Sequence, residues 1–136
     1  MRSLAEIAAL LETSDGRASP AVRADDLLRA GEEVLEHWLI AHDRKPTRAL
    51  SEGFRLLALH RQGARGDASF NACRETCREL VYHHNLVMAE PEAAAGHLTM
   101  MRFVLNHLYL FIVGKMEVAG LGEFCCASRP LRTQSA

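Results

Sequence analysis

The sequence contains FVLNHLYLFIV at residues 103–113, the most apolar stretch of its 136 residues. Apolar side chains occur there on every side of a helix, and such a helix is expected to be buried on every side. The stretch is too short to cross a bilayer, which takes about 20 apolar residues, and Arg102, Lys115 and Glu117 lie beside it. We therefore expect a helix over residues 92–118 that is either the centre of a bundle or partly faces a second subunit.

Local signals in the first part of the chain predict two further helices. Ser3 and the acid three residues after it have the spacing of a capping box, which predicts a short helix that ends near Gly16. Ser19 followed by Pro20 is an N-cap followed by the residue favoured at the first helical position. The apolar pattern then continues to Ala41, which predicts a long second helix.

Two more helices are predicted in the middle of the chain. Thr47 is the predicted cap of a third helix that breaks at Gly63, and Asp67 or Ser69 begins a fourth helix that ends before Pro91. No alternating strand pattern longer than a few residues occurs, so a sheet is not expected. The sequence therefore predicts an all-α fold, a helix bundle of four long helices plus a short N-terminal helix.

One domain accounts for these helices. The hydrophobic fraction of 49% and the charged fraction of 24% are ordinary for a globular chain of this length. We expect a single helical-bundle domain over residues 1–122 and an irregular C-terminal tail over residues 123–136, because the tail has paired cysteines, a proline and a polar end. Phe124, Cys125 and Cys126 form a segment that can dock the tail on the bundle.

Charge is nearly balanced overall but uneven along the chain. The net charge of −1 gives no reason to expect an anionic membrane as a partner. Residues 1–43 hold nine acids and four bases, whereas residues 44–78 hold eight bases and three acids. These blocks belong either to neighbouring helices that attract each other or to a basic face that awaits an acidic partner. Because the apolar run from Leu4 to Leu11 is short and interrupted by Glu6, no secretory signal is expected and the predicted location is cytoplasmic.

Nucleic acid is a disfavoured partner. The arginines of the basic block that can contact phosphates are Arg55, Arg61, Arg65, Arg74 and Arg78. The acids of the second predicted helix and the small net charge both weaken attraction to DNA or RNA. The loop over residues 63–67 can present backbone amides and an arginine to an anion, but it follows a helix and lacks Gly-Lys-Ser/Thr, so it is predicted to be a turn.

The cysteines suggest two interpretations. Cys73 and Cys77 are four residues apart on a predicted helix, so their thiols point the same way and can bind one metal ion together. Cys125 and Cys126 of the tail would then complete a four-thiolate site for zinc or iron. Core packing is the favoured interpretation, because free cysteine is commonly buried and Cys-x-x-x-Cys lacks the tight geometry of Cys-x-x-Cys. We therefore expect no bound cofactor.

The seven histidines carry no complete metal signature. Neither Glu-x-x-His nor His-x-x-x-His occurs, and these spacings are typical of di-iron bundles and helical zinc sites. His84 and His107, together with His42, are predicted to lie on or near buried faces, where a neutral imidazole needs a hydrogen-bond partner. Tyr82, Asn106 and Tyr109 are candidate partners. His84 and His107 are also the predicted inward ligands for an organic cofactor or a heme between helices.

These observations favour a small cytoplasmic accessory or regulatory protein that acts through contacts with another protein and forms a homodimer. The reason is that the apolar perimeter of residues 92–118 exceeds what one small bundle covers. The alternative from another class is a metal- or thiol-dependent redox or metal-binding protein that uses the four cysteines. An enzyme is less favoured, because the sequence contains no complete catalytic set.

Overall fold

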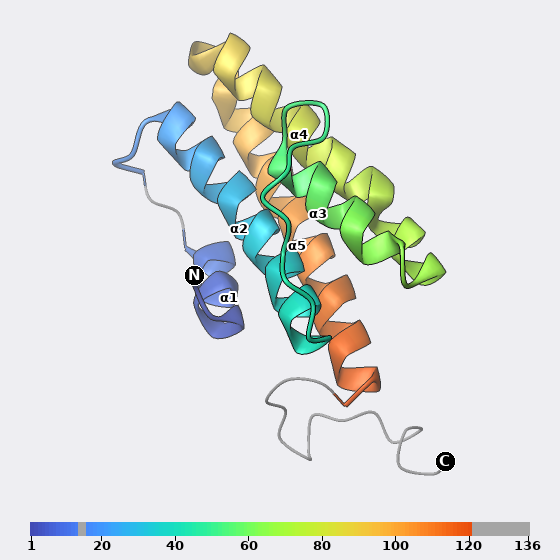
Figure 1. Ribbon diagram of the computed structural model, residues 1–136. Helices are drawn as coiled ribbons and strands as arrows, with labels where there is room; N and C mark the ends of the chain where they lie inside the picture. Colours follow the sequence, from blue (N-terminus) through green and yellow to red (C-terminus); the bar gives the residue numbers. More distant parts are fainter. Residues whose placement is uncertain (14–15, 121–136) are drawn as a thin grey trace.

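The computed structural model describes residues 1–13 and 16–120, and these residues form an all-α bundle (Figure 1). The fold class predicted from the sequence is confirmed. In chain order, the described helices are α1 (Leu4–Glu12), α2 (Pro20–Ala41), α3 (Arg55–Ala64), α4 (Arg74–Ala89) and α5 (Ala94–Val118), with short 3₁₀ segments η1 (Ala68–Cys73) and η2 (Pro91–Ala93). None of the described helices is long and apolar enough to span a bilayer. The predicted tail, its docking segment and Cys125 and Cys126 lie outside the described residues.

The predicted N-caps of α1 and α2 are confirmed. Ser3 Oγ accepts a hydrogen bond from the backbone amide of Glu6, and the Glu6 carboxylate accepts one from the amide of Ser3, both at 3.1 Å. Ser19 Oγ accepts from the amide of Val22, and Pro20 begins α2. Both caps use residues that are neighbours in sequence, so the pattern sufficed to place them.

The third helix begins at Arg55, so the prediction that Thr47 caps it is wrong. The Thr47 hydroxyl instead accepts from the amide of Ala49, and the side chain of Gln62 reaches back from α3 to the Thr47 amide and the Lys45 carbonyl. Backbone groups that a helix would have paired internally are therefore satisfied by a side chain 15 and 17 residues away.

A tight turn immediately before α3 also excludes a helix there. The backbones of Ser51 and Phe54 exchange two hydrogen bonds of 3.0 Å across the turn. Its central residues, Glu52 and Gly53, have φ values of 53° and 84°, as in the type I′ turns that join hairpin strands. Leu50, which lies between Thr47 and this turn, is 65% exposed.

Asp67 is a cap, as predicted, but of a 3₁₀ segment. Its carboxylate accepts from the amide of Ser69 at 3.0 Å and begins η1, and α4 follows directly from Arg74. α3 ends at Ala64, one residue after the predicted break at Gly63. The ring of Phe70 occupies the space where a side chain at Gly63 would stand. A Cβ at Gly63 would lie 2.5 Å from Phe70 Cε1.

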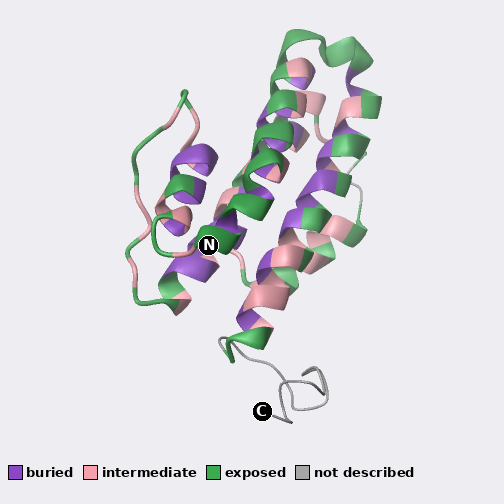
Figure 2. Cartoon of the chain, turned by 90° about the vertical axis from the view of Figure 1, so that its right-hand side faces the viewer, coloured by how far each residue is buried: buried purple, intermediate pink, exposed green. Residues whose placement is uncertain are grey.

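The core is built where α5 packs against α4 and α2, and α2 against α3. Buried positions of the helices face one another inside the bundle (Figure 2). Fully buried side chains from four helices meet there, including Leu35, Leu39, Leu56, Leu59, Leu80, Met101, Leu105 and Leu108. Burial of such side chains is the main term that stabilises a fold of this kind.

Within one copy of the chain α5 is not buried on every side, so the alternative of a fully central helix is wrong and the alternative that part of it faces a second subunit stays a prediction. Helices α2 and α4 cover two sides of it, and α1, which has only nine residues, covers part of what remains. Phe103 is 71% exposed and Leu110 is 59% exposed. The helix is therefore central to the bundle along one face and uncovered along another.

Candidate functional site

The uncovered face of α5 is an apolar strip formed by Met100, Phe103, His107 and Leu110, which we call the α5 strip. Each of the four residues is exposed. Their spacing of three, four and three residues is that of alternating a and d positions in a heptad, so the side chains follow one line along the helix. The prediction that His107 lies on a buried face is thus wrong.

The α5 strip carries no acidic or basic side chain apart from its histidine. The one nearby arginine, Arg102, turns toward α1 and donates a hydrogen bond of 2.6 Å to the Leu11 carbonyl. A groove of about 540 Å³ runs between α1 and α5 beside the strip. Its lining includes Ala8, Leu11, Phe103, Asn106, Tyr109 and Leu110. Glu12 and Arg102 are the charged residues of the described groove lining, and the rest of strip and groove is uncharged apart from His107.

Cys73 and Cys77 both point into the core, and both are free thiols. Cys73 Sγ donates to the Phe70 carbonyl at 3.2 Å. His60, at the buried face of α3, places its Nε2 at 2.8 Å from the same carbonyl oxygen. The two thiols and one imidazole therefore form a buried group around Phe70. His60 was missed by sequence reasoning, although its position four residues after the core residue Leu56 was an available signal.

Contact between the thiols separates their acidities. It lowers the pKa of Cys73 from 9.0 to about 6, and a hydrogen bond with His60 acts in the same direction against the effect of burial. The same contact, together with burial, raises the pKa of Cys77 well above 9.0. Burial lowers the pKa of His60, but its hydrogen bonds with Cys73 and the Phe70 carbonyl outweigh that effect and raise it. Cys73 is therefore the more acidic of the two thiols, and at 1% exposure it is shielded from reactants in solvent.

Metal ligands do not come together in the part of the chain that the structure describes. Among residues 1–13 and 16–120, no three His, Cys, Asp or Glu side chains are grouped so that they could hold a metal ion. A four-thiolate site would need Cys125 and Cys126, which are outside these ranges.

His84 and His107 are not brought together. His84 is buried and places Nε2 2.8 Å from the Asp25 carboxylate of α2, a partner that sequence reasoning did not name, while its buried Nδ1 has no hydrogen-bond partner among the described residues. His107 is exposed on α5. His42 is also exposed, contrary to expectation, and its ring lies over Trp38 with centroids 4.0 Å apart.

A chain of aromatic rings crosses the bundle beside the thiols. The ring centroids of Trp38 and Phe70 are 5.6 Å apart, and those of Phe70 and His60 are also 5.6 Å apart. The ammonium of Lys115 lies 5.1 Å from the Trp38 ring centroid. These contacts hold Phe70 in place between α2 and α3.

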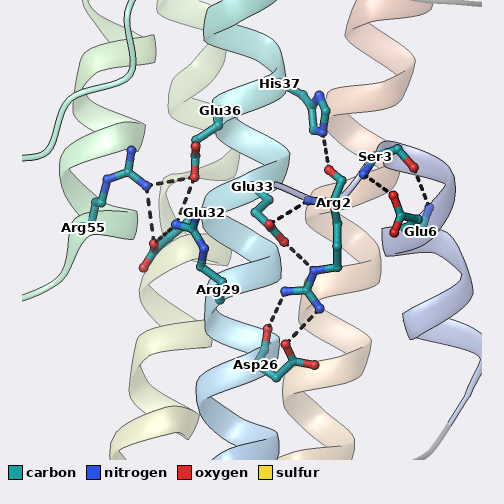
Figure 3. Close-up of polar contacts among 10 residues, drawn as sticks. All are labelled: Arg2, Ser3, Glu6, Asp26, Arg29, Glu32, Glu33, Glu36, His37 and Arg55. Atoms are coloured by element: carbon teal, nitrogen blue, oxygen red, sulfur yellow. Dashed lines mark hydrogen bonds and ion pairs between the residues drawn. The ribbon is translucent and has the colours of Figure 1, made fainter.

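Two acids on α2, the buried Glu33 and the partly exposed Asp26, anchor the N-terminal segment (Figure 3). The Glu33 carboxylate accepts from Arg2 Nε at 2.6 Å and from the Arg2 amide at 2.9 Å. Arg2 also pairs with Asp26 at 2.9 Å, and His37 Nε2 lies 2.7 Å from the Arg2 carbonyl. This network holds the start of the chain on α2, and sequence reasoning missed the burial of Glu33.

A second network joins α2 to α3 (Figure 3). Arg55 pairs with Glu36 at 2.8 Å and lies 3.6 Å from Glu32, and Arg29 contacts the same two acids at 3.1 Å and 3.0 Å. For Arg55, therefore, the acidic and basic blocks do attract each other within the molecule. This network does not include the next four arginines of the sequence, Arg61, Arg65, Arg74 and Arg78.

Comparison of the chain with family models, with curated proteins and with solved structures gave no match. The surfaces and buried groups of the bundle itself are therefore the basis for the function proposed below.

Proposed function

We propose that this protein is a small helical accessory or regulatory module that acts through protein contacts, and that a second copy docks on the α5 strip. The observation that supports this proposal is the exposure of Phe103, which stands 71% open to solvent within a line of exposed residues. Large apolar residues that gather on one face are typical of interaction sites. The expected location of the module is the cytoplasm.

The spacing of the strip favours a second copy over an unrelated partner. The intervals of three, four and three residues read the same from either end of the helix. A two-fold axis at the level of residue 105 therefore places the α5 strips of two antiparallel copies against each other. Met100 then faces Leu110 of the other copy, and Phe103 faces its His107. Such self-complementarity is what a symmetric dimer interface requires.

The exposed areas indicate a reversible dimer. Burying one fully exposed side chain of this size stabilises by about 1.5–3 kcal/mol, and three partly exposed apolar side chains on each copy contribute on the order of 5–10 kcal/mol in total. Loss of translational and rotational freedom opposes this by about 4–15 kcal/mol. The two terms are comparable, so we expect dimerisation that depends on protein concentration.

The test is light scattering coupled to size exclusion over a series of protein concentrations. We expect the wild type to shift from monomer to dimer, and Phe103→Glu to stay monomeric, because dimerisation would bury its carboxylate. The matched control is Tyr82→Glu, since Tyr82 is an aromatic residue of α4 that is 59% exposed. This control should dimerise like the wild type.

Two results would refute the proposal: a wild type that remains a monomer at the highest concentration, or a dimer that persists in Phe103→Glu. Circular dichroism of each variant checks that the helices are retained. Because Phe103 and Tyr82 are both largely exposed, neither substitution should unfold the bundle.

A second candidate function is a thiol- or metal-dependent protein, which the paired thiols of Cys73 and Cys77 favour. In this case Cys125 and Cys126 would complete a site for zinc or iron, and a reducing cytoplasm would keep the thiols available. Metal analysis of protein purified without chelator is the test. Stoichiometric metal that is lost in Cys73→Ser supports this candidate, whereas absence of metal together with thiols that react no faster than free cysteine contradicts it.

A further inference from the structure

Four arginines line one open cavity between α3 and α4. The cavity has a volume of about 480 Å³, and Arg61 and Arg65 line it from α3 and its C-terminal end, while Arg74 and Arg78 line it from α4. The turn before α3 contributes Glu52 to the wall. Cavities of this size accommodate small-molecule ligands.

The charges around the cavity are only partly neutralised within the described structure. Glu52 is the acidic residue in the described lining, and Arg78 already binds it by two hydrogen bonds of 2.7 Å and 3.2 Å. Arg61 donates to the Ser51 hydroxyl at 3.3 Å. In the described residues, Arg65 and Arg74 have neither a hydrogen bond nor an ion pair from their side chains.

The positions of these arginines place like charges close together, although the helix dipole favours Arg61 and Arg65 at the C-terminal end of α3. Arg61 with Arg65, and Arg74 with Arg78, are pairs of like charge four residues apart, which destabilises a helix. Arg74 is also the first residue of α4, where the positive end of the helix dipole repels a cation. A multiply charged anion in the cavity would relieve all of these repulsions.

We infer that the cavity binds a small molecule that carries two or more phosphate groups. Guanidinium groups donate paired hydrogen bonds in a planar fork that matches phosphate oxygens, and four of them here converge on one space. Nucleic acid is less suitable, because its backbone needs basic residues along an extended surface, whereas these residues surround a single cavity and the chain has a net charge of −1. The cavity does not include α5, so this inference is independent of the proposed dimer.

Isothermal titration with tripolyphosphate, with inorganic phosphate for comparison, tests the inference. We expect saturable one-to-one binding of tripolyphosphate and weaker binding of inorganic phosphate. Arg65→Gln and Arg74→Gln should each weaken binding by about tenfold, which is typical for the loss of one hydrogen-bonding group to a charged ligand. Glu52→Gln should strengthen binding, because it removes the negative charge from the wall.

The matched control is Arg48→Gln, which removes an exposed arginine that does not line the cavity. Its affinity for tripolyphosphate should equal that of the wild type. Thermal melts serve as a second measurement: Arg74→Gln should melt no lower than the wild type, since the substitution removes repulsion rather than a contact.

Three results would overturn the inference. The first is the absence of saturable binding to tripolyphosphate at low salt. The second is an equal loss of affinity in Arg48→Gln, which would indicate attraction to net charge alone. The third is tight binding of a single-stranded or duplex oligonucleotide that tripolyphosphate does not displace, which would assign the arginines to a nucleic-acid surface.

Discussion

Replacing Gly63 by alanine tests whether the contact between α3 and η1 is as tight as the structure shows. The new Cβ would lie 2.5, 2.8 and 2.9 Å from three carbon atoms of the Phe70 ring. That ring is fully buried and packs between Trp38 and His60, so it cannot simply turn aside. A Cβ at Gly63 therefore requires Phe70 or its neighbours in the core to move.

The magnitude follows from two opposing effects. Overpacking a core costs about 1–3 kcal/mol, whereas alanine stabilises a helix by about 1 kcal/mol relative to glycine. We expect a net loss of up to about 2 kcal/mol in the free energy of unfolding. For a chain of this length each kcal/mol corresponds to roughly 4 °C, so Tm should fall by up to about 8 °C.

Differential scanning calorimetry measures this change, and Gly114→Ala is the matched control. Gly114 lies within α5, and a Cβ there would have nothing within 4 Å. The same substitution at this position should therefore raise Tm. A rise in Tm for Gly63→Ala would show that Phe70 yields without cost, and the argument for tight packing at that contact would be refuted.

Two further predictions concern titratable groups. Hydrogen bonds from Ser69 and from the ammonium of Lys115 lower the pKa of Asp67 from 3.8 to about 2. The contribution of Asp67 to stability is therefore complete above pH 4 and is lost as pH falls toward 2. Asp67→Asn should remove that part of the acid dependence of urea unfolding, and an unchanged acid dependence would contradict this prediction. Cys77→Ala should raise the pKa of Cys73, since the contact with Cys77 is the largest effect that lowers it. Ultraviolet titration of the thiolate measures this shift, and an unchanged midpoint would show that the contact is not its cause.

The parts of the fold that depend on local contacts were predictable. Ser3, Ser19 and Asp67 cap their segments through residues two or three positions away, and a linear sequence shows such spacing directly. The start of α3 was not predictable in this way. It depends on Gln62, which satisfies backbone groups of a distant loop only after the chain has folded.

In the candidate site too, features set by local spacing were predictable, whereas features set by the packing of helices were not. The shared direction of Cys73 and Cys77 follows from helical spacing, and spacing also places His60 on the buried face of α3. The contact of His60 with Cys73 joins two elements and is not shown by spacing within either one. Likewise, the apolar character of α5 was evident, whereas the exposure of Phe103 depends on how little of α5 the short helix α1 covers. Which face of an apolar helix remains open is a property of the assembled bundle.

The contacting rings of Trp38, Phe70 and His60 connect the fluorescence of Trp38 to changes at His60. Trp38 is the single tryptophan of the chain, and His60 lies in the wall of the arginine cavity. An anion that displaces His60 would disturb Phe70 and, through it, the surroundings of the indole. We therefore expect intrinsic fluorescence to change when an anion that moves His60 occupies the cavity.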